Sequence, residues 1–480
     1  MESKNPYFSS CNGWDVAFLK DISLKIGSGS TPRGGESAYI SERTNFAFIR
    51  SQNIYDFTFD VNGLRFISDE DANKLKGVHL QKDDVLLNIT GDGVTFSRCC
   101  LVPEEILPAA VNQHVAIIRL DTTKCLPGYL MAYLCLPETK SYIESFNAGG
   151  SRRAITKGHI ESFEVPLPPM IIQEHISRVT LGLLAKQYIN IQLNQTLEQM
   201  AQALFKSWFV DFDPVVDNAL DAGFFEQDLA LPDELLRRAE ARRTVRESGN
   251  LKPLPDATRQ LFPAAFEECA EPALGLGGWV PQGWEHGCVA DVARYSTKRI
   301  DTEELTLENY ISTENMLADR KGFQSAANLP TVNSVPAYTT GSILISNIRP
   351  YFKKIWLANG NGGHSNDVLG FEAKNADTEC YVFNLMYQDS FFDFMMATSK
   401  GSKMPRGDKK AILEWGLIVP PLNLRLFFSE KVSNFYTSSY GRHHENITLA
   451  QLRDTLLPKL ISGELRLDQI EADFAKEGVA

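Results

Sequence analysis

The thiol and imidazole side chains of this 480-residue sequence are the first candidates for metal binding or nucleophilic catalysis. There are eight cysteines and eight histidines, and no two cysteines have the C-x-x-C spacing of a zinc site. Cys99 and Cys100 are adjacent, so we expect free thiols, mostly buried, and no disulfide framework. His443 and His444 form the only close histidine pair, in a polar stretch typical of a solvated helix face. The sequence therefore predicts no metal centre.

Motifs that bind phosphates or activate a nucleophile are also missing. The run GSGSTPRGG at 27–35 lacks the lysine and spacing of a phosphate-binding loop, and GLGG at 275–278 follows no predicted strand. Neither GSGST nor GGSRR completes a G-x-S-x-G motif. The stretch DFDPV around Asp213 lacks the Asn/Asp-Pro-Pro-aromatic loop of amino-methyltransferases. The sequence thus favours a protein that binds or organises other molecules, without a reaction centre.

The net charge of −12 argues against a chain that is basic throughout, as a simple nucleic-acid binder would be. The charge is uneven, however, because SKGSKMPRGDKK at 399–410 carries five basic residues and one acid. The sequence contains no run of 18 apolar residues, so it predicts no membrane-spanning helix. The first twenty residues show no secretory signal. We therefore expect a cytoplasmic protein with a locally basic face.

The second half of the chain repeats the first. NQTLEQMAQALF at 194–205 recurs 252 positions later as NITLAQLRDTLL at 446–457. At the same offset FEVPLPPMIIQ (163–173) matches WGLIVPPLNLR (415–425), whereas the match weakens further upstream. The chain is therefore predicted to be one duplicated half whose first part diverged.

Each half has two parts with different sequence patterns. Its first part consists of short apolar runs such as VAIIRL and SILISNI, broken by Gly, Pro, Asn and Asp, and predicts a mostly-β globular unit. Its second part has helical periodicity and begins at a Pro pair, at 168–169 and again at 420–421. The predicted parts are a first globular unit (1–167), a first helical region (168–213), a charged linker with short helices (214–283), a second globular unit (284–419), a second helical region (420–470) and a tail (471–480).

The two helical regions each predict a coiled-coil seam, with apolar residues at alternating steps of four and three and polar residues in the middle. We expect the two seams to pair with each other; the alternative is that each helix packs only on its own globular unit. The apolar positions assigned to helix pairing or partner docking are Ile176, Val179, Leu183, Leu193, Leu197, Met200, Leu204, Phe428, Phe435, Leu449, Leu452 and Leu456.

Four short motifs resemble signatures of the specificity subunits of type I restriction-modification systems. They are ALFKSWFVDFDP (203–214), LLPKLISGEL (456–465), GSGSTP (27–32) and PQGWE (281–285). The layout of globular unit, Pro-Pro pair and long helix, repeated once, is similar too, so the resemblance spans about Trp14 to Leu467. The long charged linker and Gly441 in the second helical region depart from the usual pattern.

The resemblance implies an α+β fold with two mostly-β target recognition domains, separated by two long helices that pair as an antiparallel coiled coil, with an internal pseudo-twofold repeat. It further implies that each domain reads one half of a bipartite DNA target and that the helices fix the spacing. Two methyltransferase subunits would dock on the helices, bind S-adenosylmethionine and methylate adenine at N6 in a bacterial defence system. Motor-nuclease restriction subunits would add cleavage. This chain would bind no cofactor and catalyse nothing.

Candidate DNA-binding residues are polar or basic side chains in the loops of the two globular units, because Arg and Lys suit guanine or phosphate, and Asn and Gln suit adenine. In the first unit they are Ser30, Thr31, Arg33, Gln52, Asn53, Arg98, Ser151, Arg152 and Arg153. In the second they are Lys298, Arg299, Asn315, Asn347, Arg349, Lys353, Lys354, Lys400, Ser402, Lys403 and Arg406. Asn53 and Asn315 have an alternative role as turn residues that satisfy local backbone.

Two alternatives remain open from the sequence. The chain could be a structural coiled-coil adaptor without a DNA role, or the DNA-reading part of another restriction-modification class. A cluster of five arginines between 237 and 246 is interleaved with Glu, which favours a solvated helix over a DNA-binding patch.

Overall fold

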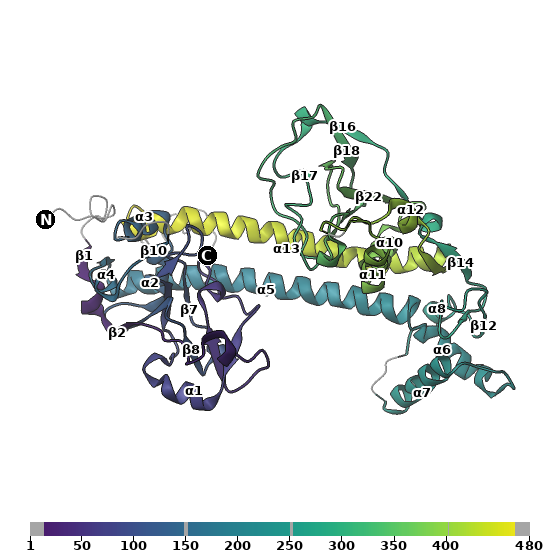
Figure 1. Ribbon diagram of the computed structural model, residues 1–480, viewed down its shortest axis with the longest axis horizontal. Helices are drawn as coiled ribbons and strands as arrows, with labels where there is room; N and C mark the ends of the chain where they lie inside the picture. Colours follow the sequence, from purple (N-terminus) through teal and green to yellow (C-terminus); the bar gives the residue numbers. More distant parts are fainter. Residues whose placement is uncertain (1–13, 148–151, 250–252, 402, 466–480) are drawn as a thin grey trace, which may run out of the picture. The chain divides into compact units, whose positions relative to one another are not determined.

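The computed structural model describes residues 14–147, 152–249, 253–401 and 403–465, which form two compact units. Unit 1 comprises Met1–Ile191 together with His443–Ala480, and unit 2 comprises Gln192–Arg442. The long helices α5 (Met170–Phe209) and α13 (Leu422–Ser462) each contribute one part to unit 1 and the other part to unit 2 (Figure 1).

Unit 1 is built on an antiparallel four-stranded sheet with the strand order β2-β9-β5-β7. Its strands are β2 (Ser23–Ser28), β9 (Val115–Leu120), β5 (Val85–Asn88) and β7 (Cys99–Leu101). A three-stranded sheet consists of β4 (Arg65–Ile67), β3 (Phe46–Ile49) and β8 (Ala109–Val111), and two-stranded ladders join β1 (Asp15–Phe18) to β11 (Glu164–Leu167) and β6 (Thr90–Gly91) to β10 (Arg153–Ala154). The helices are α1 (Asp69–Lys74), α2 (Pro127–Leu134), α3 (Pro137–Glu144) and α4 (Lys157–Glu161).

Unit 2 repeats this plan, with the strand order β15-β22-β19-β20 in its antiparallel four-stranded sheet. These strands are β15 (Ala293–Tyr295), β22 (Val368–Ala373), β19 (Ile343–Ser346) and β20 (Ile355–Leu357). A second sheet contains β16 (Arg299–Asp301), β18 (Ser334–Tyr338), β21 (Gly362–His364) and β17 (Tyr310–Ile311), and a ladder joins β14 (Glu285–Cys288) to β23 (Gly416–Val419). The helices are α9 (Val289–Val292), α10 (Glu379–Tyr387), α11 (Asp389–Ala397) and α12 (Lys409–Leu413).

One inner strand of each four-stranded sheet, β5 in unit 1 and β19 in unit 2, is called the central strand below. It is buried on both faces, which explains its continuous apolar sequence. In β5, Val85 and Leu87 enter one hydrophobic core and Leu86 enters another, because successive side chains of a strand point to opposite faces. In β19, Ile343 and Leu344 divide between two cores in the same way. The predicted α+β fold with an internal repeat is confirmed.

A buried polar residue at the start of each long helix fixes that helix to its own globular part. In unit 1, the side-chain amide of Gln173 accepts a hydrogen bond from Leu126 N at 3.0 Å and donates to Pro168 O at 3.0 Å. In unit 2, Arg425 occupies the repeat-related position and donates to Pro420 O at 3.1 Å and to Asn375 Oδ1 at 3.2 Å. The Pro pairs lie immediately before both helices, as expected.

The two long helices pair antiparallel within each unit. In unit 1, Ile176 shares a core with Leu457 and Ile461, and Gln187 Nε2 donates to Asn446 O at 2.9 Å. In unit 2, Asn194 Nδ2 donates to Ser439 O at 3.1 Å, and the rings of Phe205 and Phe428 lie 5.7 Å apart. The paired helices confirm that part of the predicted fold.

The interhelical seam differs from the predicted one. The most deeply buried side chains of α5 include Thr180, Asn190, Ala201, Phe205 and Trp208, mostly one residue beyond the predicted positions. Of the predicted residues, Ile176 and Phe428 are buried, Leu204, Phe435 and Leu456 pack partly buried against a core, and Val179, Leu183, Leu197 and Leu449 are partly exposed. Leu193, Met200 and Leu452 are 42, 50 and 43% exposed, so they lie outside the seam. The buried positions of α5 thus lie mostly one residue beyond the predicted apolar series, while Asn190, one of the polar positions in the middle of the predicted seam, is buried.

The segment between the halves belongs, in its described residues, to unit 2. It contains α6 (Asp213–Asp221), α7 (Asp233–Glu247), α8 (Asp256–Arg259) and a hairpin of β12 (Phe266–Glu268) and β13 (Trp279–Pro281). Val215, Phe224 and Phe262 join the same core as Trp208 and Trp284. The segment therefore extends the core of unit 2. Within the described residues, no helix is both long and apolar enough to cross a membrane.

Candidate nucleic-acid interface

Each unit presents the same tight turn between two strands of different sheets. In unit 1 the β8–β9 turn, Asn112–Val115, is closed by a hydrogen bond from Val115 N to Asn112 O at 3.2 Å. In unit 2 the β21–β22 turn, Ser365–Val368, is closed by the equivalent bond at 3.0 Å. The first turn residue donates to the neighbouring strand in both units, from Asn112 N to Ile49 O at 3.0 Å and from Ser365 N to Ile311 O at 2.9 Å.

Two further loops converge on each turn. Ile89 N, just after β5, donates to His114 O at 3.0 Å, and Asn347 N, just after β19, donates to Asp367 O at 2.8 Å. The segments that follow the two Gly-Ser motifs of the sequence (150–151 and 401–402) complete the crossing, because Ile155 N donates to Ile89 O and Gly407 N donates to Asn347 O. Three loops from distant parts of the sequence thus form the same backbone arrangement twice.

In unit 1, the end of β2 also packs on the β8–β9 turn. Gly29 N donates to Val115 O at 2.9 Å, and a Cβ at Gly29 would stand 2.2 Å from the backbone oxygens of Val111 and Asn112. Only glycine permits this approach. The turn therefore lies next to the predicted residues Ser30 and Thr31.

Side chains on the unit 1 turn are oriented by threonines. Thr31 Oγ1 donates to Gln113 Oε1 at 2.6 Å, and the hydroxyl of Thr90 lies 2.6 Å from Nδ1 of His114. Partial burial, and then the charge of Arg152, lower the pKa of His114 below its usual value. The His114 ring is therefore biased toward its neutral form, beside an exposed guanidinium.

The other predicted residues of unit 1 have mixed surroundings. Arg153 forms an ion pair with Glu144, and the Arg98 guanidinium stacks over the ring of Tyr55 at 4.2 Å. Ser30, Arg33, Gln52 and Arg152 are exposed. Ser151 lies outside the described residues.

In unit 2, acids neutralise several of the predicted cations. The pairs are Lys298–Glu372 at 3.5 Å, Lys353–Asp389 at 2.7 Å, Lys400–Asp408 at 2.6 Å and Arg406–Asp367 at 3.3 Å. Arg299 and Lys354 bind backbone carbonyls, of Ser334 and Thr313 respectively, and Lys403 is exposed. Ser402 is outside the described part of the chain. The predicted cations of unit 2 are thus partly neutralised by acids of the same unit. The resulting surface carries both hydrogen-bond donors and acceptors.

Asn347 and Arg349 stand at the crossing of the unit 2 loops. Arg349 adopts a left-handed backbone with φ 51°, and its Nε is buried without a hydrogen-bond partner. The Oδ1 of Asn347 is also buried without a hydrogen-bond partner. Buried polar atoms without partners are costly and are often found where a ligand completes the bonding.

Asn53 and Asn315 are buried, with relative exposures of 0 and 4%. Asn53 Oδ1 accepts from Arg50 N, and Asn315 Oδ1 accepts from Ser312 N, three residues back in each case. Both side-chain amides donate to local carbonyls. This is the geometry of turn residues, so these two side chains are poorly placed to contact DNA.

The central residues of both turns are not among the residues predicted from the sequence. They are Gln113 and His114 in unit 1, and Asn366 and Asp367 in unit 2. The only available signal was a faint alignment of VNQHV (111–115) with HSNDV (364–368). Their importance follows from the shared backbone, which the sequence does not reveal.

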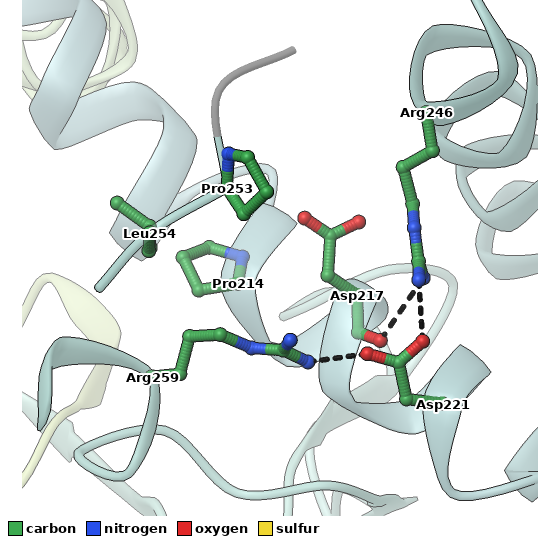
Figure 2. Close-up of a pocket in the computed structure, with 7 residues that line it drawn as sticks. All are labelled: Pro214, Asp217, Asp221, Arg246, Pro253, Leu254 and Arg259. Atoms are coloured by element: carbon green, nitrogen blue, oxygen red, sulfur yellow. Dashed lines mark hydrogen bonds and ion pairs between the residues drawn. The ribbon is translucent and has the colours of Figure 1, made fainter. Parts of the chain in front are cut away.

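The arginine cluster of α7 mostly binds acids of α6. Arg238 binds Asp213, Arg242 binds Asp217 at 3.0 Å and Arg246 binds Asp221. The pairs recur every four residues on both helices, so they form a ladder along one face of each. Figure 2 shows the end of this ladder, where Arg246 and Arg259 both reach Asp221 beside Pro214 and Leu254. These arginines therefore hold the segment together.

No group of three or more His, Cys, Asp or Glu side chains within the described residues is arranged to hold a metal ion. Burial raises the pKa of the Cys125 thiol to about 12 and also raises the pKa values of the buried Cys99 and Cys100 thiols, so these thiols are poor nucleophiles.

The chain is similar to several known proteins. The family model of the type I restriction modification DNA specificity domain matches residues 12–199. The HindI specificity subunit of Haemophilus influenzae is 24% identical, over 94% of this chain and 99% of its own length. The MjaIX specificity subunit of Methanocaldococcus jannaschii is 22% identical, over 95% and 94%. A solved type I S subunit from M. genitalium is 12% identical, over 93% of this chain and 96% of its own, with a TM-score of 0.47.

The chain has two repeated α+β units, and the relatives that it resembles along nearly its whole length are specificity subunits of type I restriction enzymes. Residues 12–199 are thus similar to the type I restriction modification DNA specificity domain, and nearly the whole chain is similar to these specificity subunits.

Proposed function

We propose that each unit reads one half of a bipartite DNA target and that the paired helices fix the distance between the halves. The observation that carries this proposal is the repeated crossing of three loops, with equal backbone hydrogen bonds but different side chains in the two units. A shared framework with divergent side chains is what two readers of different half-sites require. Three of the predicted DNA-binding residues, Thr31, Asn347 and Arg406, contact residues of this crossing.

The helices also dock the catalytic partners in this proposal. Met200 on α5 and Leu452 on α13 occupy repeat-related positions, and both apolar side chains are about half exposed, at 50 and 43%. Equivalent apolar patches suit two copies of one partner. We assign these patches to two methyltransferase subunits, which bind S-adenosylmethionine and methylate adenine N6 in the cytoplasm. Restriction subunits complete the assembly when it cleaves.

The direct test is to co-express the full chain with its methyltransferase subunit and to map the methylated adenines. The expected result is a split motif with a fixed unread spacer, and no methyl transfer by the chain alone. Methylation of a single uninterrupted motif would contradict the proposal.

A triple charge reversal distinguishes DNA reading from pure scaffolding. Lys400, Lys403 and Arg406 changed together to Glu should abolish DNA binding while assembly with the methyltransferase persists. The control reverses Arg237 and Arg243, exposed residues of α7 away from the crossing. Loss of assembly with unchanged DNA binding would favour an adaptor instead.

A further inference from the structure

The β8–β9 turn and the β21–β22 turn have the same backbone bonds but opposite chemistry at one position. His114 and Asp367 are the third residues of their turns, and each offers its carbonyl to the loop after the central strand. Gln113 and Asn366, which precede them, are both exposed amides. The framework and the amide are thus kept, and the following side chain changes.

The two side chains differ in the hydrogen bonds that they can make. When Thr90 Oγ1 donates to Nδ1 of a neutral His114, the ring proton is on Nε2, which is then a donor. The carboxylate of Asp367 offers acceptors only. Its carboxylate is 41% exposed and, with Ser365, lines a polar groove that also includes Ser312 and Asn328.

These properties match different base edges in the major groove. A donor suits the N7 and O6 acceptors of guanine or the N7 of adenine, whereas a carboxylate suits the N4 amino group of cytosine. We propose that His114 and Asp367 are specificity-determining residues, each reading one base pair of its own half-site. This inference rests on the proposed bipartite reading.

Neighbouring cations support these roles. Arg406 Nη2 lies 3.3 Å from Asp367 Oδ1 and supplies a donor beside the acceptors of the carboxylate. Arg152, exposed beside His114, can bind a phosphate and hold the duplex against the turn. Each turn is therefore paired with a cation from the segment after the Gly-Ser motif.

The test uses the full complex with the methyltransferase subunit and a library of random DNA duplexes. His114→Asp should change the preferred base pair at one position of one half-site, and Asp367→Asn should do so only in the other half. Discrimination at each position should change by about tenfold or more, as expected for a single misread base pair. Each variant is the matched control for the other, and melting of both checks folding. Asp367→Glu, which keeps the carboxylate, should retain the wild-type base preference with weaker binding.

The outcomes separate the two proposals. If the wild type selects a split sequence but both variants retain every preferred base and lose affinity evenly, the inference is overturned and the bipartite reading stands. If the wild type selects no split sequence, the bipartite reading fails and the inference with it.

Discussion

Asn190 on α5 and Asn446 on α13 hydrogen-bond to each other inside unit 1, with 2.8 Å between Nδ2 of Asn190 and Oδ1 of Asn446. Asn190 is fully buried and also donates to Glu445 Oε2 at 2.7 Å. A buried asparagine in a helical seam stabilises one register over others, because slippage leaves its amide without partners.

Replacing Asn190 by Ala should lower the free energy of unfolding by about 1–3 kcal/mol, since the amide bonds to α13 are lost. Urea unfolding measures the change. Gln195→Ala is the control, at an exposed position of the same helix, and should stay within about 0.5 kcal/mol of wild type. Equal effects would contradict a specific role for Asn190.

Met200→Asp and Leu452→Asp should each reduce the number of bound methyltransferase subunits from two to one, because a charge is placed in one apolar patch. Mass photometry of the complex measures the stoichiometry. The double variant should bind none, whereas Gln195→Ala keeps both. A single variant that loses both partners would show that the patches are not independent sites.

Gly29→Ala should weaken reading by unit 1 alone. The added methyl would collide with the backbone of the β8–β9 turn at 2.2 Å, so the turn must move. Gly27→Ala is the matched control in the same strand, because nothing lies within 4 Å of its Cβ position. Motif mapping should show degraded discrimination in one half-site for Gly29→Ala and the wild-type motif for Gly27→Ala.

Arg242→Ala should destabilise unit 2 by about 1–3 kcal/mol, because it leaves the partly buried carboxylate of Asp217 without its main partner. The control is Arg243→Ala, because Arg243 is 47% exposed and lies 3.4 Å from Glu240. This substitution should lower the free energy of unfolding by less than about 0.5 kcal/mol. Neither change should alter DNA affinity. Weaker DNA binding by Arg242→Ala at full stability would reopen a direct DNA role for α7.

Glu198 should make unit 2 less stable as the pH rises. Burial raises the pKa of this carboxyl, and hydrogen bonding from Tyr387 and the charge of Arg320 oppose that rise only in part. Above about pH 4.5 the unfolded chain loses this proton while the folded unit retains it, so stability falls until the raised pKa is passed. Urea midpoints from pH 4.5 to 7 should decline less for Glu198→Gln than for wild type, while Glu174→Gln, exposed on α5, should follow wild type.

The repeat alone predicted most of the fold, since two copies of a Pro-Pro pair and a helical run must form two copies of one structure. Thr180 is not part of the predicted seam although it is buried, because a threonine between apolar residues gives no signal of burial; Asn190, a polar position within the predicted seam, is buried too. The α6–α7 ladder did have a signal, since each arginine stands 25 positions after its aspartate.

The reading turns could not be predicted for a different reason. His114 and Asp367 share a position only through backbone hydrogen bonds, and the side chains at that position diverged. The basic residues that the sequence did suggest include several, such as Lys400 and Lys353, whose charges acids already balance.

Unit 1 is assembled from segments that the ribosome makes far apart in time. Its core includes Leu457, Leu460 and Ile461 of α13, and Trp14 Nε1 donates to Ile461 O at 3.0 Å. The N-terminal part of unit 1 therefore keeps apolar surface exposed until all of unit 2 and the end of α13 have been synthesised. At about 5–20 residues per second that delay is roughly 15–60 seconds, a window in which chaperones or partner subunits have access to the nascent chain.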